Sequence, residues 1–405
     1  MKYVVILGDG MADRPLDELD GKTPLEAANI PAMDFLARNG DVGLVKTIPD
    51  GMSPGSDTAN LSVLGYDPSV YYTGRSPLEA VSMGVSLGPT DVAMRCNLVT
   101  LSDGSDISDT VMVDYSAGEI STDEARLLIK TLRESFQTEK VDLFPGVSYR
   151  HCLVLRNAKT GSKCIPPHDI SGCPVKVHLP TGRYGTLLLE MMERSRQILR
   201  HHPVNISRME KGLNPANACW FWGEGTSPSL PLFRDKFGVD GSVISAVDLV
   251  KGIGICAGMS APEIPGATGN INTNFRGKAD FALEQLNNGA DFVFVHIEAP
   301  DECGHQGNAR EKTRAIELID SEVLERVLDG LNKSGHDYSI LLLPDHPTPV
   351  SLRTHTSDAV PFVLYRSKTK GTKPAERYTE NLAGKTGLYI PKGHKLMEQL
   401  ILNKF

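Results

Sequence analysis

The sequence predicts an α/β fold in which a parallel sheet, covered by helices on both faces, is interrupted by an inserted α+β domain. Short, continuously apolar runs occur near the start and again late in the chain, and polar loops and amphipathic helices separate them. Continuous apolar strands alternating with helices are typical of a parallel sheet buried on both faces. The middle of the chain departs from this order, because its strand-like pieces are short and separated by turns. That change indicates an insertion.

The N-terminal part of the sheet domain begins with one strand, one loop and one helix. A strand is predicted over 2–7, where the chain reads KYVVIL, and the loop GDGMADRP follows it. A helix is predicted over 23–40, because Thr23–Pro24 is a typical start signal and Gly40 a typical stop signal.

The same order returns in the C-terminal part. The sequence predicts, in turn, a strand over 290–298, a loop over 299–308, a long amphipathic helix over 310–335, a strand over 338–344, a loop over 345–358 and a strand over 360–365.

The insertion is expected to span residues 86–227, which leaves 1–85 and 228–405 as one discontinuous domain. SLGPTD and GEGTSPS are the expected linkers. Strand-like pieces lie at 93–101, 110–118, 149–157 and 163–170. Helices are predicted over 121–136, where Ser121 and Glu124 have capping-box spacing, and over 184–202, which Pro203 ends.

Composition excludes several classes of protein. The 405 residues carry a net charge of -8, which argues against nucleic-acid binding. No apolar run approaches the roughly 18 residues of a membrane span, and the first apolar run is too short for a signal peptide. Seven cysteines without a CxxC pair indicate reduced thiols. We therefore expect a cytoplasmic protein without nucleic-acid or membrane partners.

Acidic and histidine side chains gather in the loops that follow predicted strands. Alone, each would more often form a turn or cap a helix. Ligands of open α/β sheets bind outside the carboxyl ends of the strands, so these loops should converge on one edge. Three carboxylates and three imidazoles there would suit two divalent cations. The expected ligands are Asp9, Asp301, His305, Asp345, His346 and His355.

Ser56, in PDGMSPGSDTAN, is the candidate nucleophile. A serine hydroxyl is a poor nucleophile at neutral pH unless a neighbouring metal or base activates it. Gly55 would allow close approach of a substrate, and a helix is expected to start here, whose N-terminal amides favour a phosphate. Ser53 is the alternative, and we prefer Ser56 because Thr58 and Asn60 follow it in the predicted helix.

Five segments together resemble a known family. LGDGMADRP, PGSDTANLSVLGYDP, YTGRSPLEA, IEAPDECGH and DHPTPVSLRTHT are similar to motifs of the cofactor-independent phosphoglycerate mutases of archaeal type, members of the alkaline phosphatase superfamily. The resemblance covers nearly the whole chain. It implies an alkaline-phosphatase-like fold, two divalent metal ions, a phosphoserine intermediate and no requirement for 2,3-bisphosphoglycerate. Manganese is the metal that the family commonly uses, with magnesium, cobalt or zinc as alternatives.

The resemblance also implies roles for individual residues. Asp9, Ser56, Asp345 and His346 match the ligands of one metal ion. Asp301, His305 and His355 match the ligands of the other. Lys251, in SAVDLVKGIG, matches a lysine near the transferred phosphoryl group. His296 and Glu298 match no functional position, and we interpret them as strand residues.

The inserted domain is expected to bind the glycerate and to close over it as a lid. Four side chains are candidates for substrate binding: Arg75, Arg150, His151 and Arg208. His168 or Asp169 could carry a proton between the 2- and 3-hydroxyl groups. The tryptophans of CWFWGEG are expected to pack at a hinge, and Cys303 to fill space between two ligand positions.

The resemblance implies interconversion of 3-phosphoglycerate and 2-phosphoglycerate. Phosphoryl transfer to another small alcohol, as in a homoserine-kinase-like enzyme, is an alternative that keeps the same metal site. A plain metal-dependent phosphatase is a second alternative, although a hydrolase needs no large insertion to hold its product. A protein without catalytic activity would be expected to lack some of the matched ligands, and all seven positions are filled.

Overall fold

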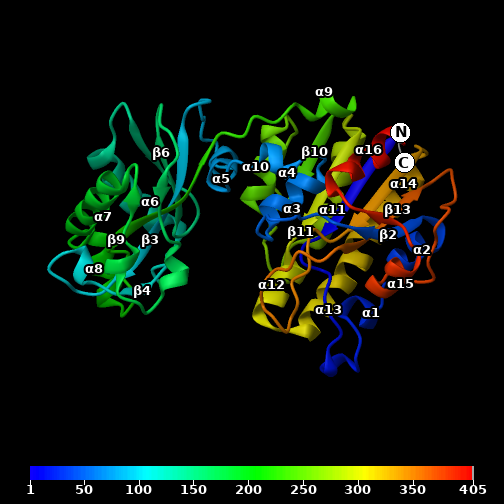
Figure 1. Ribbon diagram of the computed structural model, residues 1–405, viewed down its shortest axis with the longest axis horizontal. Helices are drawn as coiled ribbons and strands as arrows, with labels where there is room; N and C mark the ends of the chain where they lie inside the picture. The colour runs from blue at the N-terminus through cyan, green and yellow to red at the C-terminus, as the bar shows by residue number, and fades with distance from the viewer. Residues whose placement is uncertain (404–405) are drawn as a thin grey trace. The chain divides into compact units, whose positions relative to one another are not determined.

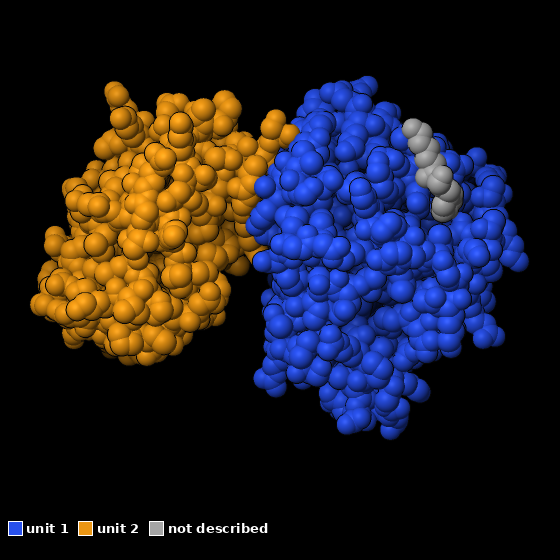
Figure 2. All heavy atoms as spheres, in the orientation of Figure 1, with its two compact units in different colours: residues 1–72, 230–405 blue, residues 73–229 orange. Residues whose placement is uncertain are grey.

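The computed structural model describes residues 1–403, and these residues form two compact units (Figures 1 and 2). The sheet unit comprises residues 1–72 and the chain from Leu230 onward. The inserted unit comprises residues 73–229.

The inserted unit begins earlier than the expected boundary at residue 86. The difference is α5 (Ser76–Ser82), which packs on β3 (Val92–Leu101) and β9 (Ala218–Thr226) of that unit. The segments expected as linkers therefore lie inside the inserted unit, and GEGT is the end of β9.

A mixed sheet forms the centre of the sheet unit. Among the described residues its strand order is β10-β11-β1-β12-β13-β2-β14. The first four strands are parallel, as the apolar runs predict, whereas β13 runs antiparallel to both of its neighbours. The strands are β1 (Lys2–Gly8), β2 (Asp41–Val45), β10 (Gly241–Ile244), β11 (Phe292–Ile297), β12 (Tyr338–Leu343), β13 (Val360–Arg366) and β14 (Tyr389–Ile390).

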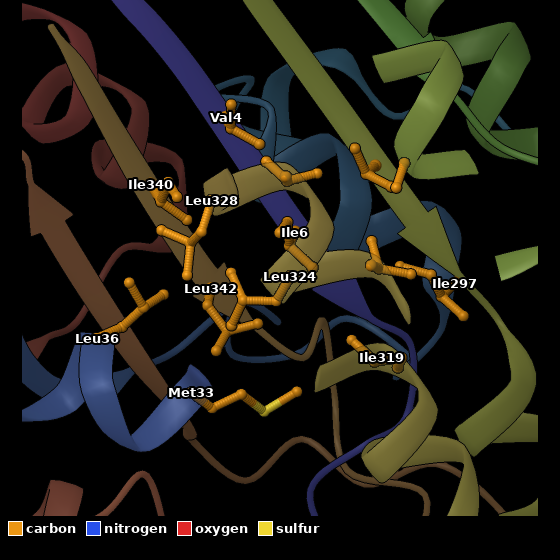
Figure 3. Close-up of a cluster of buried hydrophobic side chains, with 14 of the residues drawn as sticks. Val4, Ile6, Met33, Leu36, Ile297, Ile319, Leu324, Leu328, Ile340 and Leu342 are labelled. Atoms are coloured by element: carbon orange, nitrogen blue, oxygen red, sulfur yellow. The ribbon is translucent and has the colours of Figure 1, made fainter. Parts of the chain in front are cut away.

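The central strands are apolar at nearly every position because both faces of the sheet are covered. Val4 and Ile6 point to one face and Val5 and Leu7 to the other, and all four are fully buried. Figure 3 shows the cluster on the first face, where β1 and β12 meet side chains from the helices. Its labelled members are Val4, Ile6, Met33, Leu36, Ile297, Ile319, Leu324, Leu328, Ile340 and Leu342.

Two predicted helices are divided in the structure. The helix expected over 23–40 is α1 (Pro24–Ala27) and α2 (Pro31–Asn39), because Pro31 lacks an amide hydrogen and starts a new helix. The start signal expected at Thr23 is confirmed, because Thr23 caps α1 and forms a capping box with Glu26. The helix expected over 310–335 is α13 (Ala309–Leu318), a π-helical turn (Ile319–Leu324) and α14 (Glu325–Ser334).

The expected loop 299–308 is instead the helix α12 (Ala299–Gln306). Pro300 stands in its first turn, and Gly307, at φ 71°, ends it in the left-handed conformation. Asp301 and His305 are therefore one helical turn apart on the same face. The remaining helices of this unit are α3 (Ser56–Val63), α4 (Pro68–Tyr71), α9 (Phe233–Phe237), α10 (Asp248–Cys256), α11 (Phe275–Asn287), α15 (Glu380–Lys385) and α16 (Leu396–Leu402).

The inserted unit is built on an antiparallel sheet in which β4, β3, β6 and β5 follow one another and β9 also pairs with β3. The strand-like piece expected over 163–170 contains only Lys163, the second residue of a two-residue strand, and a 3-10 turn, Pro167–Ile170. The strands not yet placed are β4 (Met112–Asp114), β5 (Val141–Phe144), β6 (Arg150–Leu155), β7 (Ser162–Lys163) and β8 (Thr181–Gly182).

Three longer helices, α6 (Thr122–Phe136), α7 (Gly185–Leu199) and α8 (Pro203–Glu210), complete the inserted unit. Ser121 caps α6, as its spacing to Glu124 predicts. Trp220 does not pack at a hinge: it lies fully buried in the core of this unit. No helix in the described part of either unit has the length and apolar character needed to cross a bilayer.

Arg208 has a structural environment that its sequence does not reveal. Its side chain is buried, and its guanidinium donates to the carbonyl oxygens of Asn214 (2.9 Å) and Ala117 (2.7 Å) and to Oε2 of Glu124 (2.8 Å). The expectation that Arg208 binds substrate is therefore corrected: its donors already tie α6 and α8 together. A substrate carboxylate would have to break these bonds.

Replacing Arg208 with alanine is expected to destabilise the protein by about 2–3 kcal/mol, because buried acceptors lose their donor. The midpoint of urea unfolding, measured by circular dichroism, tests this. Arg126→Ala is the matched control on α6, because Arg126 is 63% exposed and its ion pair contributes little. Equal stability of the Arg208 variant and the wild type would contradict the structural assignment.

Candidate metal and nucleophile site

Three adjacent strands of the sheet end at the same edge and carry the acidic residues there. β1 pairs in parallel with β11 on one side and β12 on the other, with Leu7 opposite both His296 and Leu343. The chain beyond these three strands leads directly to Asp9, Asp301 and Asp345. Parallel pairing thus brings together side chains that lie about 300 residues apart in sequence.

The three carboxylates are buried: Asp9 is 1% exposed, Asp301 5% and Asp345 0%. Burial raises the pKa of Asp9 well above its usual value, and the charges of Asp345 and Asp301 raise it further. Burial also opposes ionisation of Asp301, but hydrogen bonds from His305 and His355 outweigh it and hold the pKa of Asp301 well below its usual range. Such a cluster requires positive charge nearby.

One group of donor atoms lies around Asp301. Its carboxylate oxygens are 3.2 Å from Nε2 of His305 and 3.4 Å from Nε2 of His355, and the two Nε2 atoms are 2.9 Å apart. Nδ1 of His305 lies 3.0 Å from the carbonyl oxygen of Arg353, which can only accept a hydrogen. With one proton held on Nδ1, loss of the Nε2 proton would leave a lone pair directed at the cluster, as a cation requires.

A second group of donor atoms consists of Asp9, Asp345 and His346. Nε2 of His346 is 3.6 Å from Oδ1 of Asp9 and 3.4 Å from Oδ2 of Asp345. His346 also joins Asp301 and His355, because the ligand atoms of those three residues lie within 4.8 Å of one another. The structure therefore places His346 between the two groups.

Ser56 begins α3, and its Oγ lies 3.2 Å from Nε2 of His346. Gly55 before it is extended, and a Cβ at that position would meet Oδ1 of Asp57 at 2.8 Å. Ser53 is exposed in the preceding loop. Ser56 is thus the serine that adjoins the ligand cluster, and its amide belongs to a helix N-terminus.

His296, which we expected to be a plain strand residue, orients Asp9. Its Nδ1 lies 3.2 Å from Oγ of Ser245, and its Nε2 lies 2.9 Å from Oδ2 of Asp9. Burial lowers the pKa of His296 to about 3, so the ring is neutral and can donate to Asp9. The other oxygen, Oδ1 of Asp9, is buried and has no hydrogen-bond partner among residues 1–403. An orphaned carboxylate oxygen of this kind fits a bound cation.

Asn60 is a second residue that sequence reasoning did not assign. Its Nδ2 donates to Oδ2 of Asp345 (3.0 Å) and to the carbonyl oxygen of Ser56 (2.8 Å). The spacing from Ser56 to Asn60 is one helical turn, so the sequence held a signal that both face the same site. No sequence pattern around His296 indicated its contact with Asp9.

Comparisons with known proteins place the chain in a family. A family model described as 2,3-bisphosphoglycerate-independent phosphoglycerate mutase matches residues 37–205. The protein of that name from Methanosarcina barkeri is 49% identical over 405 residues, covering 100% of both chains. A protein named as a probable enzyme of the same kind, from Geobacter sulfurreducens, is 51% identical over 401 residues, covering 99% of this chain and 100% of the relative. The chain belongs to this family.

Solved structures agree with this membership, which confirms the resemblance seen in the sequence. A structure of a Pyrococcus horikoshii protein is 30% identical, with a TM-score of 0.83, and covers 100% of this chain and 98% of its own. A cofactor-independent phosphoglycerate mutase from Thermoplasma acidophilum is 28% identical, with a TM-score of 0.67, and covers 100% of both chains.

Lys251, which the resemblance matches to a lysine near the transferred phosphoryl group, contacts two carboxylates in this structure. Its Nζ lies 2.8 Å from Oε1 of Glu263 and 3.2 Å from Oδ1 of Asp248, on α10. Burial would lower the pKa of Lys251, but the hydrogen bond to Glu263 and the charge of Asp248 outweigh it and raise the pKa. The amine is therefore charged, and two carboxylates hold it.

Two of the expected substrate residues of the inserted unit keep polar groups accessible. Arg150, at the start of β6, is exposed and lies over the ring of Tyr149 at 5.5 Å. Arg75 is 42% exposed and donates to Oε1 of Glu79 (2.8 Å).

His168 and Asp169 lie together in the same unit. Nε2 of His168 is 3.5 Å from Oδ1 of Asp169, and its ring packs edge-on against Trp222 with centroids 5.3 Å apart. About half of each side chain is exposed, 48% and 57%.

The expectation that His151 binds substrate is corrected. The side chain is buried, and its Nδ1 accepts from the amide of Gly146 at 3.0 Å. Burial, assisted by the charge of Arg150, lowers the pKa of His151 to about 3. A buried neutral imidazole that accepts a backbone hydrogen bond is part of the packing of the inserted unit. The sequence could not distinguish it from its exposed neighbour Arg150, because alternate residues of a strand face opposite sides.

Manganese affinity is expected to fall as pH falls below about 9. The hydrogen bond to Asp301, which outweighs the effect of burial, raises the pKa of His305 to about 9. His305 must lose this proton to bind a cation, so apparent affinity should drop about tenfold per pH unit between pH 9 and pH 6.5. Calorimetric titrations with Mn²⁺ at several pH values measure the slope. His305→Gln should flatten it, and a pH-independent affinity of the wild type would contradict the assignment.

Proposed function

We propose that this protein interconverts 3-phosphoglycerate and 2-phosphoglycerate through a phosphoserine at Ser56. The observation that supports this most directly is the Ser56 hydroxyl at the N-terminus of α3, 3.2 Å from His346 within a cluster of buried carboxylates and imidazoles. Homologues about half identical over the full length carry the name of this enzyme. We further propose that the reaction needs no 2,3-bisphosphoglycerate and takes place in the reducing cytoplasm.

The proposed reaction consists of two phosphoryl transfers. Oγ of Ser56 loses its proton and attacks phosphorus, so an Oγ–P bond forms while the bond from phosphorus to the C3 oxygen breaks. That oxygen takes up a proton and the glycerate turns. The 2-hydroxyl then loses its proton and attacks the phosphoserine, so a bond from the C2 oxygen to phosphorus forms while the Oγ–P bond breaks, and Oγ takes up a proton to restore the Ser56 hydroxyl. We assign the proton transfer between the two hydroxyl groups to His168 or Asp169 of the inserted unit.

Two divalent cations, Mn²⁺ by preference, are part of the proposal. Asp9, Ser56, Asp345 and His346 would hold one, and Asp301, His305 and His355 the other, with His346 close enough to contribute to both. The orphaned Oδ1 of Asp9 and the converging Nε2 atoms of His305 and His355 support this ligand set. When bound, the cations favour an ionised serine hydroxyl and offset the charge of the transferring phosphoryl group.

The function is tested with purified protein and Mn²⁺. Formation of 2-phosphoglycerate from 3-phosphoglycerate is followed through enolase, and chelation followed by metal addition should abolish and restore it. Phosphorylation of homoserine by ATP and release of free phosphate from 3-phosphoglycerate are measured in parallel. If turnover in either parallel assay exceeded mutase turnover, the protein would instead be assigned as a kinase or as a phosphatase.

Ser56→Ala is expected to lower mutase turnover by at least about 10⁴-fold, because the variant lacks the oxygen that receives the phosphoryl group. Ser53→Ala should be nearly as active as the wild type. Acid quenching with labelled substrate should trap phosphoserine at position 56 in the wild type and in the Ser53 variant. Substantial turnover by Ser56→Ala, with an unchanged thermal unfolding curve, would refute the phosphoserine mechanism.

Arg150→Ala is expected to lower mutase kcat/KM by about 10- to 100-fold, because a guanidinium bound to the glycerate carboxylate is lost. Hydrolysis of a small phosphate ester, which has no such carboxylate, should change little. Arg200→Ala is the control, because Arg200 is an exposed arginine elsewhere in the inserted unit. Proportional loss of both activities would mean that Arg150 does not recognise the glycerate.

A further inference from the structure

Thr348 lies between the two groups of donor atoms, and no role has so far been assigned to this residue. It is fully buried. Its Oγ1 hydrogen-bonds to Oδ1 of Asp301 and lies 3.3 Å from Nδ1 of His346. One hydroxyl group therefore contacts a residue from the first group of ligands and the residue shared by both groups.

The hydroxyl proton of Thr348 determines the proton position on His346. A carboxylate without a proton can only accept, and an imidazole that binds a cation is neutral and carries a single proton. The hydroxyl has one proton and gives it to Asp301, and must then accept a hydrogen from Nδ1 of His346. Nε2 of His346 is left with its lone pair, which faces Ser56, Asp9 and Asp345.

Two glycines make room for this hydroxyl. A Cβ at Gly10, whose φ is +61°, would lie 2.5 Å from Oγ1 of Thr348 and 2.6 Å from Oδ1 of Asp301. A Cβ at Gly304, in α12, would lie 2.5 Å from the carbonyl oxygen of Thr348. Both distances are far below van der Waals contact, so the close approach of Asp301 and Thr348 depends on these glycines.

A buried ion pair holds the backbone of Thr348. Nζ of Lys312 is fully buried and has three acceptors, which are the carbonyl oxygens of Ala12 (3.2 Å) and Thr348 (2.8 Å) and Oδ2 of Asp13 (2.7 Å). The carboxylate of Asp13 accepts in turn from the amide of Val350 at 3.1 Å. The loop that carries Asp9 and the loop that carries Asp345 and His346 are thereby fastened to each other.

We propose that Thr348 is a positioning residue of the metal site, which fixes His346 with its proton on Nδ1 and ties His346 to Asp301, while Lys312 and Asp13 hold Thr348 in place. The proposal rests on the proposed function, because it concerns the same cations. It also explains what holds the two groups of ligands in a fixed position relative to each other. The hydroxyl group of Thr348 contacts Asp301 of one group and His346, which belongs to both. Histidine ligands commonly depend on such a partner for their ring orientation.

Thr348→Val and Thr348→Ser provide the test, because valine keeps the shape and serine keeps the hydroxyl. Nitrogen-15 chemical shifts of the His346 ring in metal-free protein report which nitrogen carries the proton. The wild type and the serine variant should show a proton on Nδ1, and the valine variant should lose this preference. Calorimetry should show two Mn²⁺ ions bound by the wild type and by Thr348→Ser, and about 10- to 100-fold weaker binding by Thr348→Val.

Thr313→Val is the matched control, because Thr313 lies on α13 and its hydroxyl donates to the carbonyl oxygen of Ala309. It should bind Mn²⁺ as the wild type does. A Thr348→Val protein that retains the Nδ1 proton and wild-type Mn²⁺ affinity would overturn the proposal while leaving the proposed function intact. A wild type that binds no Mn²⁺ would instead overturn the metal assignment on which both depend.

The double variant Asp13→Asn/Lys312→Met tests the second part and substitutes for Thr348→Val if that variant does not fold. Replacing a buried ion pair by neutral side chains of similar size commonly preserves folding. Its Mn²⁺ affinity should fall by at least about tenfold with a disturbed His346 spectrum. Wild-type affinity together with a wild-type spectrum would show that the ion pair does not position Thr348.

Discussion

Burying three carboxylates side by side is the constraint on which the arrangement of the sheet unit depends. Asp9, Asp301 and Asp345 lie there because three neighbouring parallel strands end at one edge. Water cannot solvate these charges, so they must share positive charge or hydrogen-bond donors. The histidines, Asn60 and the backbone amides of Gly10 and His346 are placed around them for this reason.

Two buried lysines lie near the cluster without neutralising its carboxylates directly. Nζ of Lys278 donates to the carbonyl oxygen of His296 at 3.0 Å, and Nζ of Lys312 bonds to two carbonyl oxygens and to Asp13. These ammonium groups supply positive charge near the cluster without bonding to its three carboxylates. The oxygen of Asp9 that faces His346 therefore stays without a partner. The negative charge of this site therefore remains available to the cations that we propose.

The inserted unit uses a half-buried glutamate to organise its arginines. Glu79 accepts from both Arg75 and Arg95, and although burial would raise its pKa, the two guanidinium groups lower that pKa to about 2. Arg95 in turn lies over the ring of Trp222, at 4.4 Å from its centroid, and His168 meets the same ring edge-on. One acidic side chain thus holds cationic and aromatic groups in a fixed arrangement, which suits recognition of an anion.

The sequence by itself determined the class of fold and most of the donor set. Apolar runs identify β1, β11 and β12, and the acids and histidines that follow them are the residues that meet at the sheet edge. Tertiary structure alone decided the rest, because contacts between residues some 300 positions apart leave no local pattern: Lys312 with Ala12 and His296 with Asp9 are examples. Tertiary structure also decided that His151 and Arg208 are buried whereas Arg150 is exposed. Residue type does not reveal which side of a strand or helix faces the core.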